Sequence, residues 1–166
     1  MVEANKNCEP ALRLLSKPYD IVALSDKQGF AELYVEKINP VATGASLYKE
    51  NTDWYEEGKY ETITVPTDTL DNRNYFNGDP IDLIKIDVQG AELDILKGGE
   101  KTMQNTSYAL LELSLLEYNQ GAPLIGEVVD KMVDYGFCIV DILEYHSFPQ
   151  LYGGAIFQID ALFKKL

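Results

Sequence analysis

The chain has 166 residues, 46% of them hydrophobic, which is enough for one α/β core and too few for two ordinary domains. Its 14 basic and 27 acidic side chains give a formal net charge of −13, which repels phosphate backbones and excludes nucleic acid as an expected partner. Cys8 and Cys138 form neither a disulfide framework nor a metal-binding spacing, and no run reaches the roughly 20 apolar residues of a membrane helix. Since no signal-peptide pattern is present either, we expect a soluble, cytoplasmic protein without a membrane partner.

The first residues are typical of the last part of a buried strand, which indicates that the chain starts in the middle of a fold. A short strand ending in Glu3 is followed by an expected helix at residues 9–15, where Pro10 is tolerated in the first turn. Residues 20–24 and 30–35 are rich in apolar side chains, and the polar, glycine-containing segment between them favours a turn. We expect two strands joined by this turn.

The next part of the chain combines an irregular segment with one strand. Residues 38–60 lack a regular hydrophobic period and contain Trp54 and Tyr55, which predicts a surface excursion with exposed aromatic side chains. Residues 61–65 alternate as a strand does, and the Thr-Asp-Thr sequence at residues 67–69 indicates the start of a helix.

The second half of the chain alternates strands with helices. Strands are expected at residues 81–86, 108–113, 137–143 and 155–163, and helices at residues 91–103 and 123–135. The first strand is almost entirely apolar, as for a strand buried on both faces, and Gly98-Gly99 interrupts the helix after it. This order predicts a single α/β domain over residues 1–166, with a mostly parallel sheet and an antiparallel last strand joined by a hairpin.

Polar residues and a glycine stand at or near the expected carboxyl ends of several strands. In open α/β sheets, ligands bind at this edge, where the following loops can aim polar groups at them. The residues placed there are Glu3, Ser25, Asp26, Asp87, Gly90 and Glu112. Their convergence on one edge predicts a small-molecule site.

Most of these residues also have an ordinary structural interpretation. Asp87 could cap the following helix, and the nearby Glu92 could interact with the helix dipole. Ser25 and Asp26 could simply form a turn.

Glu112 is harder to explain structurally, because an unpaired carboxylate within an apolar strand is costly. Lys85 is a candidate partner for it, unless the lysine extends to the edge of the sheet instead. His146 is the only histidine and stands in an expected loop, where a surface role is the ordinary interpretation. No metal site is predicted, although Asp87 together with Glu112 could hold a hard cation.

Residues 81–103, IDLIKIDVQGAELDILKGGEKTM, closely resemble the most characteristic segment of the FkbM family of methyltransferases. Upstream, VEANKNCEPAL, VALSDKQGFAELYV, GASL and TVPTDTLD occur in the order that this family shows. Downstream, ALLELSLLEYNQGAP, the Gly-Phe pair at 136–137 and QIDALFKK resemble its closing strands. The resemblance covers essentially the whole chain.

The resemblance implies a Rossmann-like class I fold that transfers the methyl group of S-adenosyl-L-methionine, usually to a hydroxyl oxygen of a sugar or natural product. By position, Glu3 would bind the ribose hydroxyls of the cofactor, which suits a carboxylate because it can accept from both. Ser25 and Asp26 would lie near the adenine.

The same resemblance places Asp87 near the methionine end of the cofactor and the transferred methyl group. Gly90 follows Asp87 at a point where the backbone can approach a ligand closely, which makes it a candidate for cofactor binding. Glu112 would line the side of the small-molecule or glycan acceptor. Asp87 and His146 are the candidates for the base that removes the hydroxyl proton.

One departure from the family concerns the start of the chain. The family's first strand, its glycine-rich turn and the following helix should precede VEANKN and are absent from the sequence. The first strand lies centrally in the family's sheet, so we expect these 166 residues alone to be poorly stable and to bind S-adenosylmethionine weakly or not at all.

Two other functions remain open at this point. The chain could be a non-catalytic carbohydrate-binding or interaction module that uses Trp54, Tyr55 and Tyr60 as stacking surfaces. A receiver-like signalling domain with Asp87 as phosphoacceptor is a weaker alternative, because the acidic cluster it needs early in the chain is missing.

Overall fold

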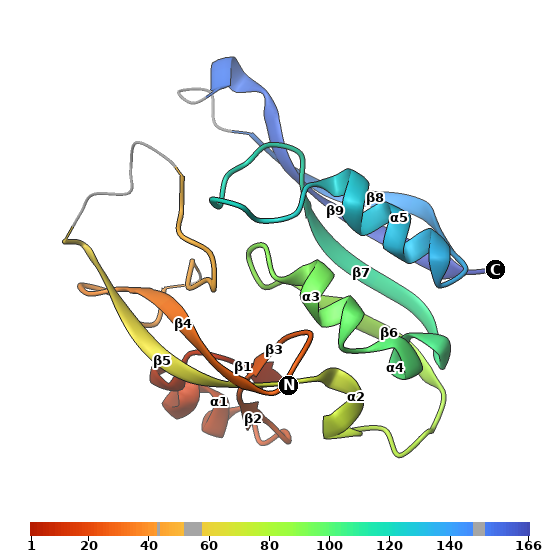
Figure 1. Cartoon of the computed structure of the whole chain (residues 1–166), viewed down its shortest axis with the longest axis horizontal. Helices are drawn as coiled ribbons and strands as arrows, with labels where there is room; N and C mark the ends of the chain where they lie inside the picture. Colours follow the sequence, from red (N-terminus) through yellow and green to blue (C-terminus); the bar gives the residue numbers. More distant parts are fainter. Residues whose placement is uncertain (43, 52–57, 148–151) are drawn as a thin grey trace.

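The structure is a computed structural model that describes residues 1–42, 44–51, 58–147 and 152–166. The N-terminal half contains β1 (Val2–Glu3), the 3-10 helix η1 (Lys6–Cys8), α1 (Glu9–Leu14), β2 (Asp20–Ile21), β3 (Ala23–Leu24), β4 (Gly29–Glu36), β5 (Tyr60–Asp68) and α2 (Leu70–Arg73). The C-terminal half contains β6 (Ile81–Ile86), α3 (Glu92–Lys97), α4 (Glu100–Gln104), β7 (Thr106–Ser114), α5 (Ile125–Asp134), β8 (Phe137–Ser147), the 3-10 helix η2 (Tyr152–Gly154) and β9 (Ile156–Lys165). Figure 1 shows these halves as two groups of strands side by side, with α3 and α4 between them.

The N-terminal half forms two small sheets that continue into one another. β1 pairs in parallel with β2, while β5 lies between β3, which is parallel to it, and β4, which is antiparallel. The N–H of Val22, between β2 and β3, donates to the carbonyl of Glu3 at 2.9 Å, so the pairing with β1 extends past β2. Buried Ala23, Leu33 and Val65 form the centre of a small apolar cluster in this half.

The C-terminal half is one sheet in the order β6-β7-β9-β8, with β6 and β7 parallel and the other pairs antiparallel. One face packs against α3, α4 and α5, because alternate residues of β7 are apolar and completely buried. The main core includes Ile86, Ile95, Leu96, Met103, Ala109, Leu111, Leu113, Val128, Met132, Phe137, Ala161 and Phe163. Glu112 points to the opposite face, as the alternation along a strand requires.

The predicted α/β class is confirmed, but the expectation of a mostly parallel sheet is not. In the described ranges, three of the six strand pairs are antiparallel. The physical reason is that β5 folds back on β4, and β9 folds back on β8, and antiparallel neighbours do not need the helical crossover that parallel strands require. The predicted break at Gly98-Gly99 is confirmed, since α3 ends before these residues and α4 begins after them.

The expected surface excursion at residues 38–60 is only partly described. Trp54 and Tyr55 lie outside the described residues, and the Tyr60 hydroxyl donates to Glu50 at 3.3 Å. Part of this segment is not an exposed loop, because Ser46 is 3% exposed and forms a bridge with Tyr34 of β4.

The two halves are held together by contacts of helices and loops, including an isolated β-bridge between Glu50 and Asn119. Within the described chain, no named strand of one half pairs with a named strand of the other. The carboxylate of Asp71 in α2 accepts hydrogen bonds from the backbone of Lys101 at 2.9 Å and from the backbone and hydroxyl of Thr102 at 2.9 and 2.8 Å. Gly98 packs so closely on the carbonyl of Ser25 that a Cβ atom would overlap it. β1 pairs only with β2, and β6 pairs only with β7. Both β1 and β6 therefore have one edge without a partner among the described residues.

None of the helices in the described ranges combines the length and the hydrophobicity that a membrane crossing requires.

Candidate active site

A cavity of about 200 Å³ lies between the ends of β1 and β3 in one half and the loop after β6 in the other. Its polar lining includes Glu3 and Asn5 from the first half and Asp87 and Gln89 from the second. Its apolar lining consists of residues such as Val22, Ala23, Leu24, Leu33, Val88 and Ile95. The cavity therefore combines apolar walls with a few converging polar groups, which is typical of small-molecule sites.

Glu3 is held by a tight turn directly after β1. Its Oε1 atom accepts a hydrogen bond of 2.7 Å from the backbone N–H of Asn5. Asn5 is 1% exposed, and its side chain donates to the carbonyl of Pro40 at 2.6 Å and accepts from the N–H of Asn7 at 3.1 Å. A carboxylate has several acceptor sites, so Glu3 can bind further donors while it keeps the bond to Asn5.

The loop between β6 and α3 turns sharply into the helix. Gln89 has φ 57° and Gly90 has φ 110°, both in the left-handed region that L side chains rarely adopt. The carbonyl of Gln89 accepts hydrogen bonds from the Ser46 hydroxyl at 2.7 Å and the Asn119 amide at 2.8 Å. These two contacts from distant loops fix the Gln89 backbone in this conformation.

Gly90 has a packing role that its position after the strand does not reveal. It is buried, and a Cβ atom would lie 2.9 Å from the Cβ of Ala122. Gly90 does not line the cavity; its N–H donates to Glu92 at 3.1 Å. Glu92 is 4% exposed, so it serves this loop as a buried acceptor.

Asp87 lines the cavity and lies beside a lysine. Lys85 Nζ is 3.1 Å from Asp87 Oδ2, and both side chains are about half exposed. The hydrogen bond and the charge of Asp87 raise the pKa of Lys85. Lys85 was expected either to pair with Glu112 or to extend to the edge of the sheet. The structure shows the second arrangement, in which Lys85 pairs with Asp87.

Glu112 lies outside the cavity but is connected to it through Gln89. The Gln89 amide donates to Glu112 Oε2 at 2.6 Å. Burial, followed by the negative charges of Asp87, Glu92 and Asp160, raises the pKa of Glu112 to about 8. The structure thus brings the predicted Asp87 and Glu112 into one electrostatic environment.

Three other predicted residues do not line the cavity. Ser25 and Asp26 follow Leu24, which does; the Ser25 hydroxyl donates to Asp26 at 3.3 Å, and Asp26 is exposed. His146 lies in β8 and not in the expected loop, with Nε2 at 3.8 Å from Asp160 Oδ1.

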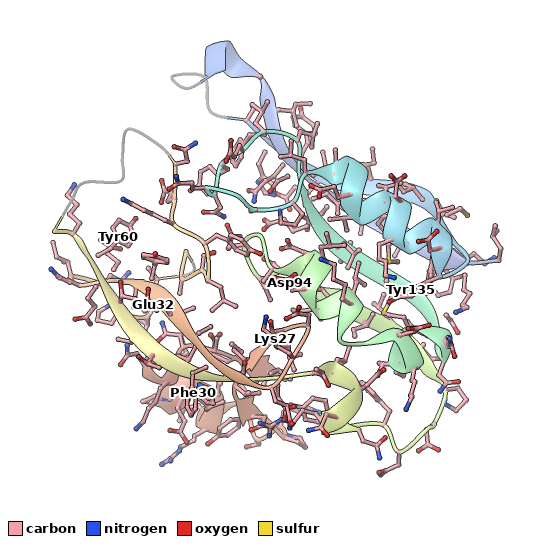
Figure 2. All side chains as sticks on the ribbon, viewed as in Figure 1. Lys27, Phe30, Glu32, Tyr60, Asp94 and Tyr135 are labelled. Carbon is pink, nitrogen blue, oxygen red and sulfur yellow. The ribbon has the colours of Figure 1, made fainter. Side chains whose placement is uncertain are left out.

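The segment before β5 contributes contacts that sequence reasoning missed. The Tyr48 hydroxyl donates to Asp94 of α3 at 2.9 Å, and Figure 2 shows Asp94 on the side of that helix toward the N-terminal half. Burial, reinforced by the bond to Asp94, raises the pKa of Tyr48. Only the GASL sequence that contains Ser46 could have indicated that this loop packs near the site.

Comparison with known proteins agrees with the family resemblance that the sequence segments indicate. The sequence profile of the methyltransferase FkbM domain matches residues 1–139. The 2-O-methyltransferase NoeI of Sinorhizobium fredii (strain NBRC 101917 / NGR234) is 35% identical over 122 residues, which cover 69% of this chain and 50% of that protein. The chain thus spans about half the length of this curated relative, and no solved structure matches it significantly. The chain belongs to the FkbM family of methyltransferases.

Proposed function

We propose that the chain forms part of a methyltransferase that uses S-adenosylmethionine to methylate a hydroxyl group of a sugar or other natural product. The observation that carries this proposal is the presence of Glu3 and Asp87 on one cavity, although they lie at the ends of strands of different sheets. The similarity to a protein named as a 2-O-methyltransferase favours oxygen as the methylated atom. The net charge of −13 favours a small-molecule or glycan acceptor over a polyanion.

The residues that line the cavity, and those next to it, suit the chemistry of S-adenosylmethionine. In this proposal Glu3 accepts hydrogen bonds from the ribose hydroxyls, and Ser25 and Asp26 lie near the adenine beyond Leu24. Gly90 keeps the loop backbone near the methionine end. A cavity of about 200 Å³ is smaller than the roughly 300 Å³ at which ligand pockets begin, so it accounts for part of a nucleotide site.

The chain's own residues can supply orientation and proton transfer. When bound, S-adenosylmethionine supplies a methyl group whose carbon forms a bond to the acceptor oxygen while the C–S electron pair returns to sulfur. Asp87 is the candidate that takes the hydroxyl proton, because it lines the cavity and Lys85 holds its carboxylate at 3.1 Å without lining the cavity itself. Glu112 lines the acceptor side in this proposal. His146 is a weaker candidate base, since it does not border the cavity.

We also infer a Rossmann-like class I arrangement for a single domain that includes residues 1–166. The partnerless edges of β1 and β6 in the described chain support it, because one further parallel strand between them would join the two halves into one sheet. A glycine-rich turn after that strand would complete the nucleotide site. The free thiols of Cys8 and Cys138 support a reducing, cytoplasmic location.

A methyl-transfer assay tests the proposed function. The upstream-extended protein would be incubated with S-adenosylmethionine labelled in the methyl group and with a panel of glycans and small alcohols. We expect at least one acceptor to be labelled, and we expect Asp87→Asn to reduce the rate about 100-fold or more, as loss of a general base does. Asp134→Asn, which removes an exposed carboxylate at the end of α5, should leave the rate unchanged. Equal rates for the two variants would remove Asp87 from the mechanism.

A further inference from the structure

A second group of chemically active side chains lies on the face of the C-terminal sheet that α3, α4 and α5 leave uncovered. Glu112 of β7, Asp160 of β9 and His146 of β8 come from three adjacent strands. Glu112 is directly paired with Asp160, and His146 is paired with Gln158, two residues before Asp160. Since residues two apart on a strand point to the same face, this pairing places the three side chains together.

The three side chains converge to a distance suited to metal binding. One ligand atom from each residue lies within 4.8 Å of the other two. His146 Nε2 and Asp160 Oδ1 are 3.8 Å apart, too far for a hydrogen bond. Metal–ligand distances of about 2.1 Å separate the ligands of one ion by roughly 3 to 4 Å, so small side-chain rotations would close the site around an ion.

The charges around the group favour a cation. Asp87 and Glu92 add negative charge near Glu112. The ammonium group of Lys85 offsets part of this charge, and it is paired with Asp87 at 3.1 Å. Each of the three ligand residues is partly buried, so solvent screens their repulsion less than it would on an open surface. The side chain of His146 is 35% exposed, which leaves a path by which an ion can enter.

We propose that Glu112, His146 and Asp160 bind one divalent metal ion that accepts mixed nitrogen and oxygen ligands, such as Mn²⁺. One imidazole and two carboxylates form half of an octahedral set and leave positions open for water or an acceptor hydroxyl. Gln89 orients the Glu112 carboxylate from outside this set, through its 2.6 Å hydrogen bond, and also lines the cavity. A role for the ion in activating an acceptor hydroxyl rests on the proposed function, whereas metal binding itself does not.

Mn²⁺ binding to the untagged 166-residue chain tests the site without cofactor or acceptor. Calorimetry and the loss of the free Mn²⁺ signal in electron paramagnetic resonance should show one saturable site. Because His146 is the only histidine, pulsed resonance on the wild-type chain should detect a directly bound imidazole nitrogen, and no variant is needed to assign it. A chain that binds no Mn²⁺, or binds it without a nitrogen ligand, would overturn the proposal.

Matched variants separate this site from general attraction by an acidic surface. We expect His146→Ala and Asp160→Asn to weaken Mn²⁺ binding by at least about tenfold, since even outer-shell partners of metal ligands cost this much. Asp134→Asn changes the net charge by the same amount as Asp160→Asn and should leave the affinity unchanged. Equal weakening by these two aspartate variants would also contradict the proposal. Circular dichroism of each variant would confirm that it remains folded.

Discussion

Gln89 donates a hydrogen bond of 2.6 Å from its side-chain amide to Oε2 of Glu112, and this bond connects the loop after β6 to the uncovered face of β7. Gln89 also lines the cavity, and its backbone has φ 57°. Its carbonyl is held by Ser46 and Asn119, so three distant parts of the chain meet at this residue. The conformation of Gln89 thereby couples the cavity to the environment of Glu112.

The first prediction concerns this hydrogen bond. Gln89→Leu keeps a side chain of similar length but removes the amide donor. The partly buried carboxyl group of Glu112 then loses this hydrogen bond. We expect the free energy of unfolding to fall by about 1 to 3 kcal/mol, as for other buried polar groups that lose their hydrogen-bond partner. Urea denaturation measures the change, with the exposed Gln104→Leu in α4 as the control. Equal denaturation midpoints for the two variants would show that Gln89 adds nothing to stability.

The second prediction concerns the contact between the two halves. Gly98→Ala places a Cβ atom against the carbonyl of Ser25, and neither backbone can move without disturbing α3 or the end of β3. We expect a loss of about 2 to 3 kcal/mol from this overpacking. Gly126→Ala in α5 is the matched control, because its added Cβ meets no atom within 4 Å. In that position alanine should raise stability by up to about 1 kcal/mol, since it is the better helix former.

Thermal denaturation of the two alanine variants checks the contact. The expected result is a lower midpoint for Gly98→Ala and a slightly higher one for Gly126→Ala. If both variants shift the midpoint in the same direction and by the same amount, the close packing of Gly98 on Ser25 is not present in solution.

Elements with a strong hydrophobic period could be predicted closely from the sequence. The expected strand at residues 81–86 has the bounds of β6, and the expected helix at residues 123–135 contains α5, Ile125–Asp134. The prediction that the strand is buried on both faces is wrong, because β6 lies at the end of its sheet and Leu83 is 54% exposed. Such periods are local, so each element can be inferred without its neighbours. The pairing of strands could not be inferred in this way, because it depends on which edges meet in space.

The site was predicted less completely, for the same physical reason. Residues at the ends of strands are visible in the sequence, which is why Glu3 and Asp87, which both line the cavity, could be named as candidates. The contacts of Gln89 with Ser46 and Glu112 join residues 43 and 23 positions apart, and no local pattern signals them. Asp26 differs from these two residues, since its place after a strand suggested a site, but its side chain is exposed and does not line this cavity.

The third prediction concerns the pH dependence of stability. Burial raises the pKa of Glu92 above its ordinary value of 4.5, against the opposing hydrogen bonds from Gly90 and Val88. The folded state therefore binds the proton more tightly than the unfolded state. The resulting stabilisation is fully present below the unfolded pKa and is lost as pH rises through the folded pKa.

Glu92→Gln tests this sign, because glutamine keeps an acceptor for the loop N–H groups and never ionises. We expect the stability of the variant relative to the wild type to rise steadily with pH above about 4.5 and then to level off. Glu61→Gln, at an exposed position of β5, should show no such trend. Urea denaturation over a series of pH values measures both, and a flat difference for Glu92→Gln would contradict the buried-charge explanation.

The last prediction concerns cofactor binding. A cavity of about 200 Å³ lined by Val2 and Glu3 of β1 and by the loop after β6 provides few contacts for a nucleotide of the size of S-adenosylmethionine. We expect the 166 residues alone to bind it with a Kd no tighter than about 1 mM, or roughly 4 kcal/mol. Isothermal titration showing micromolar binding by this chain would contradict the expectation.

Protein extended upstream by a further strand should bind S-adenosylmethionine far more tightly. In that protein Glu3→Gln should weaken binding about tenfold or more, because hydrogen bonds to charged groups contribute about 1.5 to 3 kcal/mol. Glu32→Gln removes an exposed carboxylate of β4 (Figure 2) and should leave the affinity unchanged, so a comparable loss in both variants would assign the effect to net charge and not to the ribose contact.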